Sequence, residues 1–212
     1  MTHLTLREDE RGLALVGDGL ELRCDFSRSL PRLRASNLHR ELLVRAARVR
    51  GLDEVPRVVD ATAGLGEDSV LLAAAGMQVT LVEREPMLAA LLRDGLQRAA
   101  RQPELAPIAS RMRLIEGDSV EVLASLDEQP HVVYLDPMFP AKRKQAATNK
   151  KLQLIQRLEL PCANEEELLG AALAVHPRKV VIKRPLKGPC LAGAKPSGSL
   201  RGKVVRYDIV VP

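Results

Sequence analysis

The stretch that decides the fold covers residues 57–76 and reads RVVDATAGLGEDSVLLAAAG. A short apolar run ends at Asp60, small residues follow through Gly66, and the sequence becomes amphipathic from Glu67 onward. This order predicts a strand, a tight loop and a helix. Backbone N–H groups and a helix N-terminus would then lie at the carboxyl end of a buried strand, where glycine lets a ligand approach closely. We therefore expect a nucleotide-like cofactor at this loop.

The spacing of small residues in the loop distinguishes between cofactors. A dinucleotide site typically has G-x-G-x-x-G directly after the strand. Here the acid Asp60 comes first, and the small residues Thr62, Gly64 and Gly66 follow at alternate positions. This pattern resembles the first motif of class I S-adenosylmethionine-dependent methyltransferases, acid-x-Gly-x-Gly-x-Gly, with Thr62 at the first glycine. The alternative is a helix-capping turn of the kind found in many α/β proteins.

Length and composition favour one globular domain. The 212 residues are enough to bury a good core. No apolar run reaches the roughly 18 residues of a membrane span, and the first residues lack the apolar core of a signal peptide, so we expect a cytoplasmic protein. The three cysteines and four histidines are scattered. We therefore expect neither a disulfide framework nor a metal site.

The net charge of +5 is concentrated in three basic segments. Their members are Arg28, Arg32 and Arg34, then Lys142, Arg143, Lys144, Lys150 and Lys151, and finally Lys183, Arg184 and Lys187. Phosphate groups are the natural partners of such segments, so the pattern favours nucleic acid, with a solvated basic face as the alternative. Aromatic residues make up only 2% of the chain. Base stacking must therefore rest on one or two side chains.

Strand and helix patterns alternate along the rest of the chain. We expect strands at 78–83, 112–116, 131–135, 179–183 and 204–211, and helices at 36–50, 86–100, 119–126 and 165–174. A hairpin at 12–23 precedes them, a basic loop covers 27–34, and Arg184-Pro185 forms another loop. Such alternation predicts a twisted parallel sheet with helices on both faces.

Acidic residues follow the second and third strands of this pattern. Glu83 ends its strand and can accept hydrogen bonds from both ribose hydroxyls of a nucleoside cofactor. The alternative is a surface glutamate paired with Arg84. Asp118-Ser119 lies where class I methyltransferases contact adenine, although a helix cap explains the same residues, and both roles can hold together.

The fourth strand runs into the sequence Asp136-Pro-Met-Phe-Pro140. Its two prolines stiffen the chain where a parallel sheet opens its binding crevice. The sequence resembles the (D/N)PP(Y/F) motif of methyltransferases that act on exocyclic amino groups, with Met138 at the second proline. An ordinary Asp-Pro turn is the alternative. Because acids end several successive strands, we favour the functional interpretation.

These segments together resemble the ribosomal RNA small subunit methyltransferase J family, whose members methylate guanine N2. The resemblance rests on VVDATAGLGEDSVLLA, VTLVEREPMLAALLRDGL, VVYLDPMFPAKRK, VVIKRP and RYDIVV. It implies a Rossmann-like α/β fold with a seven-stranded, mostly parallel sheet in the order 3-2-1-4-5-7-6. We expect residues 1–35 to form a hairpin and basic-loop extension, and residues 36–212 to form the methyltransferase domain.

The resemblance also implies a set of site residues, S-adenosylmethionine as the cofactor and 16S rRNA or the small ribosomal subunit as the partner. The expected catalytic residues are Asp136, Pro137 and Phe139. The expected cofactor residues are Asp60, Gly64, Gly66, Glu67, Asp68, Glu83, Arg84, Asp118, Ser119 and Asp136. The expected RNA contacts are Lys142, Arg143, Lys144, Lys150, Lys151, Lys183 and Arg184.

Three other functions fit parts of the sequence. A nicotinamide-dependent oxidoreductase would share the fold and Glu83, but it leaves the motif at Asp136 and the basic segments without a purpose. An RNA-binding ribosome-assembly protein would need the basic segments and no cofactor. An adenine-N6 methyltransferase would share the amino-group motif.

Overall fold

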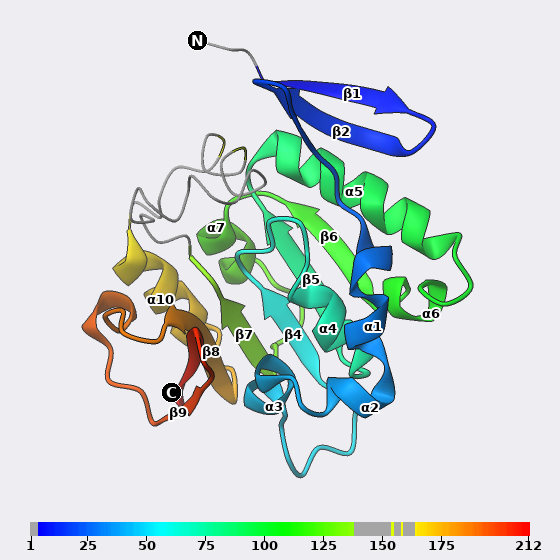
Figure 1. Ribbon diagram of the computed structural model, residues 1–212. Helices are drawn as coiled ribbons and strands as arrows, with labels where there is room; N and C mark the ends of the chain where they lie inside the picture. The colour runs from blue at the N-terminus through cyan, green and yellow to red at the C-terminus, as the bar shows by residue number, and fades with distance from the viewer. Residues whose placement is uncertain (1–3, 138–153, 155–157, 159–163) are drawn as a thin grey trace.

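The computed structural model describes residues 4–137, 154, 158 and 164–212 (Figure 1). Its central sheet has the strand order β6-β5-β4-β7-β8-β10-β9. The strands are β4 (Arg57–Asp60), β5 (Gln78–Glu83), β6 (Met112–Glu116), β7 (Val132–Leu135), β8 (Lys179–Pro185), β9 (Gly198–Arg201) and β10 (Val205–Val210). Strand β10 runs antiparallel to β8 and β9, and the other pairs are parallel. Numbered within the sheet, this order is 3-2-1-4-5-7-6, which confirms the predicted fold class.

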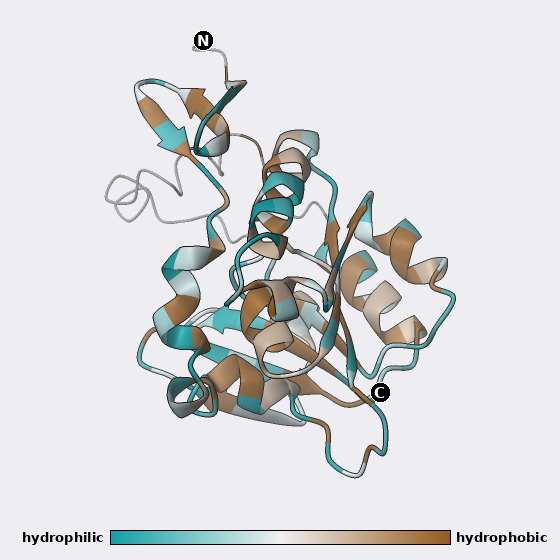
Figure 2. Ribbon diagram, turned by 90° about the vertical axis from the view of Figure 1, so that its right-hand side faces the viewer, coloured by the Kyte–Doolittle hydropathy of each residue, from teal (hydrophilic) through white to brown (hydrophobic). Residues whose placement is uncertain are grey.

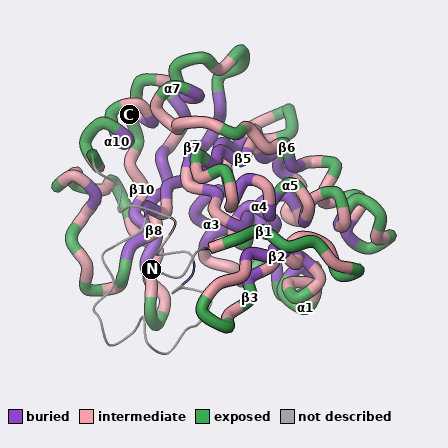
Figure 3. Tube along the Cα trace, turned by 90° about the horizontal axis from the view of Figure 1, so that it is seen from above, coloured by how far each residue is buried: buried purple, intermediate pink, exposed green. Residues whose placement is uncertain are grey.

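Helices cover both faces of the sheet because its inner strands are apolar on both sides. Val58 and Val132 belong to the hydrophobic cluster that includes α3, α4 and α5, whereas Val59 and Val133 belong to the cluster that includes α7 and α10. The bounds are α3 (Leu42–Ala47), α4 (Ser69–Ala74), α5 (Pro86–Ala100), α7 (Ser119–Ala124) and α10 (Glu165–Ala174). Figure 2 shows the central strands as mostly hydrophobic, and Figure 3 shows the buried strands between the two groups of helices.

The N-terminal extension contains the predicted hairpin, and a further strand extends it to a three-stranded antiparallel sheet. It consists of β1 (Thr5–Asp9), β2 (Gly12–Gly17) and β3 (Leu20–Leu22). Strand β1 was missed because its sequence TLRED is mostly polar and four of its residues are exposed, so it has no apolar alternation. Strand β2 packs against α5, and Leu15 and Leu22 join the main hydrophobic cluster. The division of the chain at residue 35 stays a prediction.

Two predictions near the N-terminus were wrong, a loop at 27–34 and one continuous helix at 36–50. Residues 27–34 form a 3-10 helix, η1 (Phe26–Ser29), and α1 (Leu30–Leu33), instead of a loop. Pro31 lies in the first turn of α1, where proline is compatible with a helix. The expected helix at 36–50 is divided into α2 (Ala35–Leu38) and α3, with Glu41 in extended conformation before α3.

The C-terminal third also differs from the prediction. Strand β8 continues through Arg184 to Pro185, which had been expected to form a loop. Strand β9 arises in a segment rich in glycine, proline and serine, where no strand was expected. The short helices α6 (Ala106–Ala109) and η2 (Leu191–Gly193) were not expected either. In the described part of the chain, no helix has the length and apolar character to cross a bilayer.

Candidate functional site

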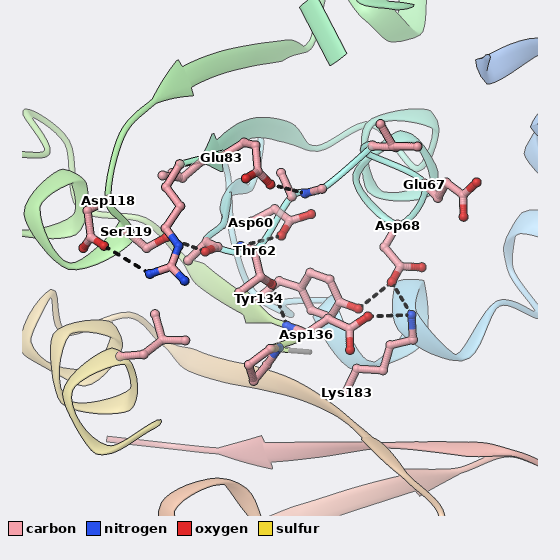
Figure 4. Close-up of a pocket in the computed structure, with 18 of the residues that line it drawn as sticks. Asp60, Thr62, Glu67, Asp68, Glu83, Asp118, Ser119, Tyr134, Asp136 and Lys183 are labelled. Atoms are coloured by element: carbon pink, nitrogen blue, oxygen red, sulfur yellow. Dashed lines mark hydrogen bonds and ion pairs between the residues drawn. The ribbon is translucent and has the colours of Figure 1, made fainter. Parts of the chain in front are cut away.

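A cavity of about 810 Å³ opens at the carboxyl ends of β4, β5 and β7. Its volume lies in the range of small-molecule and cofactor sites. The predicted site residues that line it are Asp60, Gly64, Glu67, Asp68, Glu83, Arg84, Asp118, Ser119, Asp136, Pro137 and Lys183. Figure 4 labels eight of these residues and shows that they come from separate elements and converge on one space. The structure therefore brings together residues spread over more than half of the chain.

Asp60 joins the loop after β4 to the start of α4. Its side chain is 2% exposed and accepts hydrogen bonds from the Thr62 N–H (3.1 Å) and the Ser69 hydroxyl (2.5 Å). Burial raises the pKa of Asp60 to about 7, and these two hydrogen bonds oppose part of that rise. Asp60 thus fixes both ends of the loop through these hydrogen bonds, and it also borders the cavity.

Glu83 is held rigidly beside the same loop. One carboxylate oxygen accepts the Gly64 N–H and the other accepts the Glu85 N–H, each at 2.8 Å. The residue is 6% exposed, and its burial raises the pKa of the carboxyl group above its usual value. Arg84 approaches Asp118 at 3.9 Å. The alternative of a surface glutamate paired with Arg84 is therefore wrong.

Gly64 and Gly66 have different positions in the loop. Both have positive φ angles, 53° and 71°, which favour glycine. Gly64 lines the cavity, whereas Gly66 does not. A Cβ at Gly66 would lie 3.0 Å from Leu92 and 3.3 Å from Phe26. Gly66 thus allows close packing beneath the loop, and the structure gives it no contact with the cavity.

Asp118 and Ser119 begin α7 and border the cavity at the same time. The Asp118 side chain accepts the Val120 N–H at 2.9 Å, which is a helix N-cap. The Ser119 hydroxyl donates to the Ala61 carbonyl at 2.5 Å, which ties α7 to the loop after β4. The capping interpretation is confirmed. It does not exclude a ligand contact, because both residues face the cavity.

Asp136 belongs to a cluster of polar groups at the ends of β7 and β8. The Lys183 ammonium lies 2.9 Å from the Asp136 carboxylate and 2.6 Å from that of Asp68. The Tyr134 hydroxyl donates to Asp68 at 2.6 Å, and the Asp136 N–H donates to the Thr62 hydroxyl at 2.7 Å. Burial raises the pKa of Asp136, and Lys183 opposes the rise. Burial disfavours the charge of Lys183, but Asp68 and Asp136 outweigh it and raise the pKa of this lysine.

The structure gives protein partners to two of the predicted RNA contacts. Lys183 is engaged by the two carboxylates, and Arg184 is 1% exposed. The Arg184 guanidinium donates to the Pro189 carbonyl at 2.9 Å and lies 3.4 Å from Glu165. Such burial argues against a phosphate contact at Arg184. The other predicted RNA contacts, Lys142, Arg143, Lys144, Lys150 and Lys151, and the predicted catalytic Phe139 lie outside the described residues.

The cavity is also lined by residues that were not predicted for it, among them Arg32 and Tyr207. Arg32 lies in the last turn of α1, and its side chain donates two 2.9 Å hydrogen bonds to Glu41. Tyr207 lies on β10, in register with Lys183 of β8. The sequence predicted a strand that includes Tyr207. It did not reveal that this strand pairs with the one that carries Lys183, because that pairing depends on the order of strands in the sheet.

The lining of the cavity is acidic although the whole chain is basic. Among its described lining residues, eight have carboxylate side chains and three, Arg32, Arg84 and Lys183, are cationic. The net charge of the chain is +5. A cavity of this kind favours a ligand with positive charge and disfavours one that carries phosphate groups. In the described part of the chain, no group of histidine, cysteine and acidic residues has the arrangement to hold a metal ion.

Comparison with known proteins identifies the family. The family described as "Putative SAM-dependent methyltransferase" matches residues 3–212. The chain belongs to this family. Its relatives include a ribosomal RNA small subunit methyltransferase J of Pseudomonas aeruginosa (strain UCBPP-PA14). It is 54% identical over 155 residues, which is 73% of this chain and 59% of the relative. This chain therefore spans well under two thirds of that relative's length.

Two other matches agree with the family. A ribosomal RNA small subunit methyltransferase J of Thioalkalivibrio sulfidiphilus is 47% identical over 177 residues, or 82% of this chain and 69% of the relative. The crystal structure of a SAM-dependent methyltransferase from Neisseria gonorrhoeae aligns with a TM-score of 0.82 and 33% identity. That alignment covers 100% of this chain and 84% of the other. The resemblance described from the sequence is confirmed at the level of family and fold.

Proposed function

We propose that this chain binds S-adenosylmethionine in the acidic cavity and transfers its methyl group to the exocyclic N2 of a guanine in 16S rRNA. The observation that carries the proposal is the convergence of Glu83 and Asp136 on one cavity. Glu83 ends the strand that meets the ribose in this fold, and Asp136 begins an amino-group motif. Relatives named for small-subunit rRNA methylation support the same substrate.

The residues present fit S-adenosylmethionine. The Glu83 carboxylate is fixed by two backbone N–H groups, and its remaining lone pairs can accept hydrogen bonds from ribose hydroxyls. The cofactor has a sulfonium and an ammonium group, which suit a cavity rich in carboxylates. A nicotinamide dinucleotide has two phosphates, and the same lining would repel them. The charge of the cavity thus favours methyl transfer over the oxidoreductase alternative.

The chain's own groups supply positioning and a proton acceptor. Bound S-adenosylmethionine supplies an electrophilic methyl group on a positively charged sulfur. Asp136 and the Pro137 carbonyl accept hydrogen bonds from the two N2 hydrogens, which orients the amino group. Transfer to N2 would leave the electron pair of the broken S–C bond on sulfur, so the group left for the chain to accept would be the N2 proton. The proton released from N2 passes to Asp136 and then to water, and positioning is the larger contribution of this carboxylate.

The substrate accounts for the positive charge of the chain. RNA binding depends mainly on contacts between basic side chains and phosphates. The sequence predicts such contacts in the basic segment at 142–151. A 16S rRNA substrate, free or in the small ribosomal subunit, also implies that the protein works in the cytoplasm.

The proposal is tested by binding and product analysis. Calorimetry with S-adenosylhomocysteine should show saturable binding, and NADH should show none. Small subunits from a strain lacking this protein should accept a labelled methyl group, and nucleoside mass spectrometry should detect N2-methylguanosine. A product of N6-methyladenosine would instead assign the adenine-directed alternative. Absence of cofactor binding would favour the assembly-protein alternative.

Substitution of Asp136 connects this activity with the cavity. Asp136→Ala should lower single-turnover transfer on the order of 100-fold or more, because misplacing a reacting group by about 1 Å can cost that much. RNA affinity should remain close to that of the wild type. Asp53→Ala is a matched control, since Asp53 is exposed and does not line the cavity. Equal activity in Asp136→Ala and Asp53→Ala would reject the assigned role.

A further inference from the structure

Lys183 occupies an unusual place for a lysine in a basic segment. Its side chain is 24% exposed, and its ammonium contacts carboxylates from two separate loops. Asp68 precedes α4 on the loop predicted to bind the cofactor, and Asp136 follows β7 in the motif predicted to receive the target amino group. The ammonium therefore connects the two halves of the proposed site (Figure 4).

We propose that Lys183 is a positioning residue for methyl transfer, holding the Asp136 carboxylate in place and charged beside the cofactor loop. This inference rests on the proposed function of the site. It replaces the expectation that Lys183 binds RNA phosphate, because an ammonium held by two carboxylates has little capacity left for an external anion.

The contacts of the two carboxylates are not equivalent. Asp68 accepts hydrogen bonds from both Lys183 and the Tyr134 hydroxyl, each at 2.6 Å. Among the described residues, Lys183 is the group that bonds the Asp136 carboxylate, at 2.9 Å. Removal of the ammonium should therefore release Asp136 more than Asp68. Removal of the Tyr134 hydroxyl should leave the Lys183–Asp136 contact in place.

The scaffold makes Lys183 suited to this task. It lies within β8, which is paired with β7 on one side and with β10 on the other. Side chains supported by strands are held more precisely than those on loops. Asp136 directly follows β7, and its own N–H donates to the Thr62 hydroxyl in the loop after β4. The lysine thus fixes the side chain of a residue whose backbone is already fixed.

Several charged or titratable groups influence the Asp136 carboxylate. In the described part of the chain they are Lys183 and Arg184 of β8, Asp60 of β4, Asp68 before α4, Tyr134 of β7 and Tyr207 of β10. Lys183 is the cation in contact with it, whereas the nearby Asp68 carboxylate raises the pKa of Asp136 through like charge. Without the ammonium, burial and like charge both favour protonation. The protonated carboxyl is a weaker acceptor for the N2 hydrogen assigned to Asp136, and it cannot take up the released proton.

Four proteins test the proposal: the wild type, Lys183→Met, Lys183→Arg and Lys179→Met. Lys179 is a matched control on the same strand, where its ammonium donates to the Ala46 and Arg48 carbonyls, and it does not line the cavity. Single-turnover transfer at saturating RNA and cofactor should fall on the order of 10- to 100-fold in Lys183→Met. Lys183→Arg should recover part of the loss because it restores a cation. Lys179→Met should transfer at close to the wild-type rate.

Other readouts separate positioning from a structural role and from RNA binding. The acidic limb of the rate profile should move to higher pH in Lys183→Met, since activity needs ionised Asp136. RNA affinity and its salt dependence should stay unchanged. Wild-type transfer rates in Lys183→Met, or a reduced salt dependence with an unaltered rate, would overturn the proposal. A loss of thermal stability that parallels the loss of rate in every variant would also overturn it.

One measurement does not depend on activity. Carbon-13 NMR of aspartate-labelled protein follows the titration of the Asp136 carboxyl, assigned by comparison with Asp136→Asn. The Asp136 titration should occur at higher pH in Lys183→Met than in the wild type or in Lys179→Met. If the wild type transfers no methyl group, the proposed function fails, and this titration still decides whether Lys183 controls the carboxylate. An unshifted titration would reject that control.

Discussion

Replacement of Glu83 by alanine is the sharpest test of the cofactor site. Its carboxylate now accepts hydrogen bonds from the Gly64 and Glu85 N–H groups, and we expect it also to accept from ribose hydroxyls. A hydrogen bond to a charged group contributes about 1.5–3 kcal/mol, and water can take part of this role in an open cavity. We therefore expect Glu83→Ala to weaken cofactor binding by about 1–3 kcal/mol, or roughly 5- to 150-fold.

The assay is calorimetric titration with S-adenosylhomocysteine, together with thermal melting. Glu83→Ala should also melt earlier, since two backbone donors lose their acceptor. Glu85→Ala is the matched control, because Glu85 caps α5 and does not line the cavity. Loss of an N-cap costs about 1 kcal/mol of stability. The control should thus melt earlier with unchanged cofactor affinity.

Calorimetry and melting together show whether Glu83 contacts the cofactor or only stabilises the loop that contains Gly64. Glu83→Gln keeps the shape of the side chain but places an amide N–H₂ group against one of the two backbone donors. Its affinity should lie between those of the wild type and Glu83→Ala. Folded Glu83→Ala with wild-type affinity would remove Glu83 from the cofactor site and refute the reasoning.

Three further predictions concern the pH dependence, the basic segment and the motif at Asp136. The pKa of Asp60 is raised to about 7 in the folded protein, so the folded state binds more protons and stability falls as pH rises from about 4 to 7; denaturant melts of Asp60→Asn should show less of this fall, and identical pH profiles would contradict the assigned burial. Neutralising Lys142, Arg143 and Lys144 together should reduce the log–log salt slope of RNA binding by roughly 0.7–0.9 per lost phosphate contact, and an unchanged slope would mark these residues as a solvated face. Phe139→Ala should lower transfer through loss of a base-stacking contact of about 1–3 kcal/mol, whereas Phe139→Tyr should retain activity; parallel losses of stability would make Phe139 a core residue.

Elements with a strong local pattern were predictable from the sequence. The strand at Gln78–Glu83 and the helix at Pro86–Ala100 have the predicted bounds. The strand has a dense apolar run that ends in an acid, and the helix has proline in its first turn. Strands β1 and β9 were missed because each is an edge strand that depends on pairing with the next strand along the chain, β2 or β10, rather than on an apolar pattern of its own. Their own sequences, TLRED and GSLR, have little apolar content.

The candidate site was predictable where it depends on topology alone. Carboxyl ends of neighbouring parallel strands meet at one edge, so Asp60, Glu83 and Asp136 had to lie close together. The contact between Lys183 and two carboxylates could not be read in the same way. The local sequence KRP does not indicate whether the Lys183 ammonium faces solvent or a cavity. Its direction depends on the face of β8 that it occupies and on acids supplied by other elements.

The separation of charge between the cavity and the rest of the chain gives the site a means of selecting what enters. The acidic lining, with carboxylates such as Glu67 and Asp136, repels phosphate, while the chain as a whole is positive. Screening limits such fields to about 10 Å at 0.1 M salt, so the field of the carboxylates acts only close to the cavity. We expect the RNA backbone to remain outside the cavity on basic side chains, because phosphate near the carboxylates is unfavourable. A neutral base can enter alone. Extrusion of that base from its neighbours is how enzymes reach an atom on a stacked base, and the charge pattern would orient it with the amino group toward Asp136.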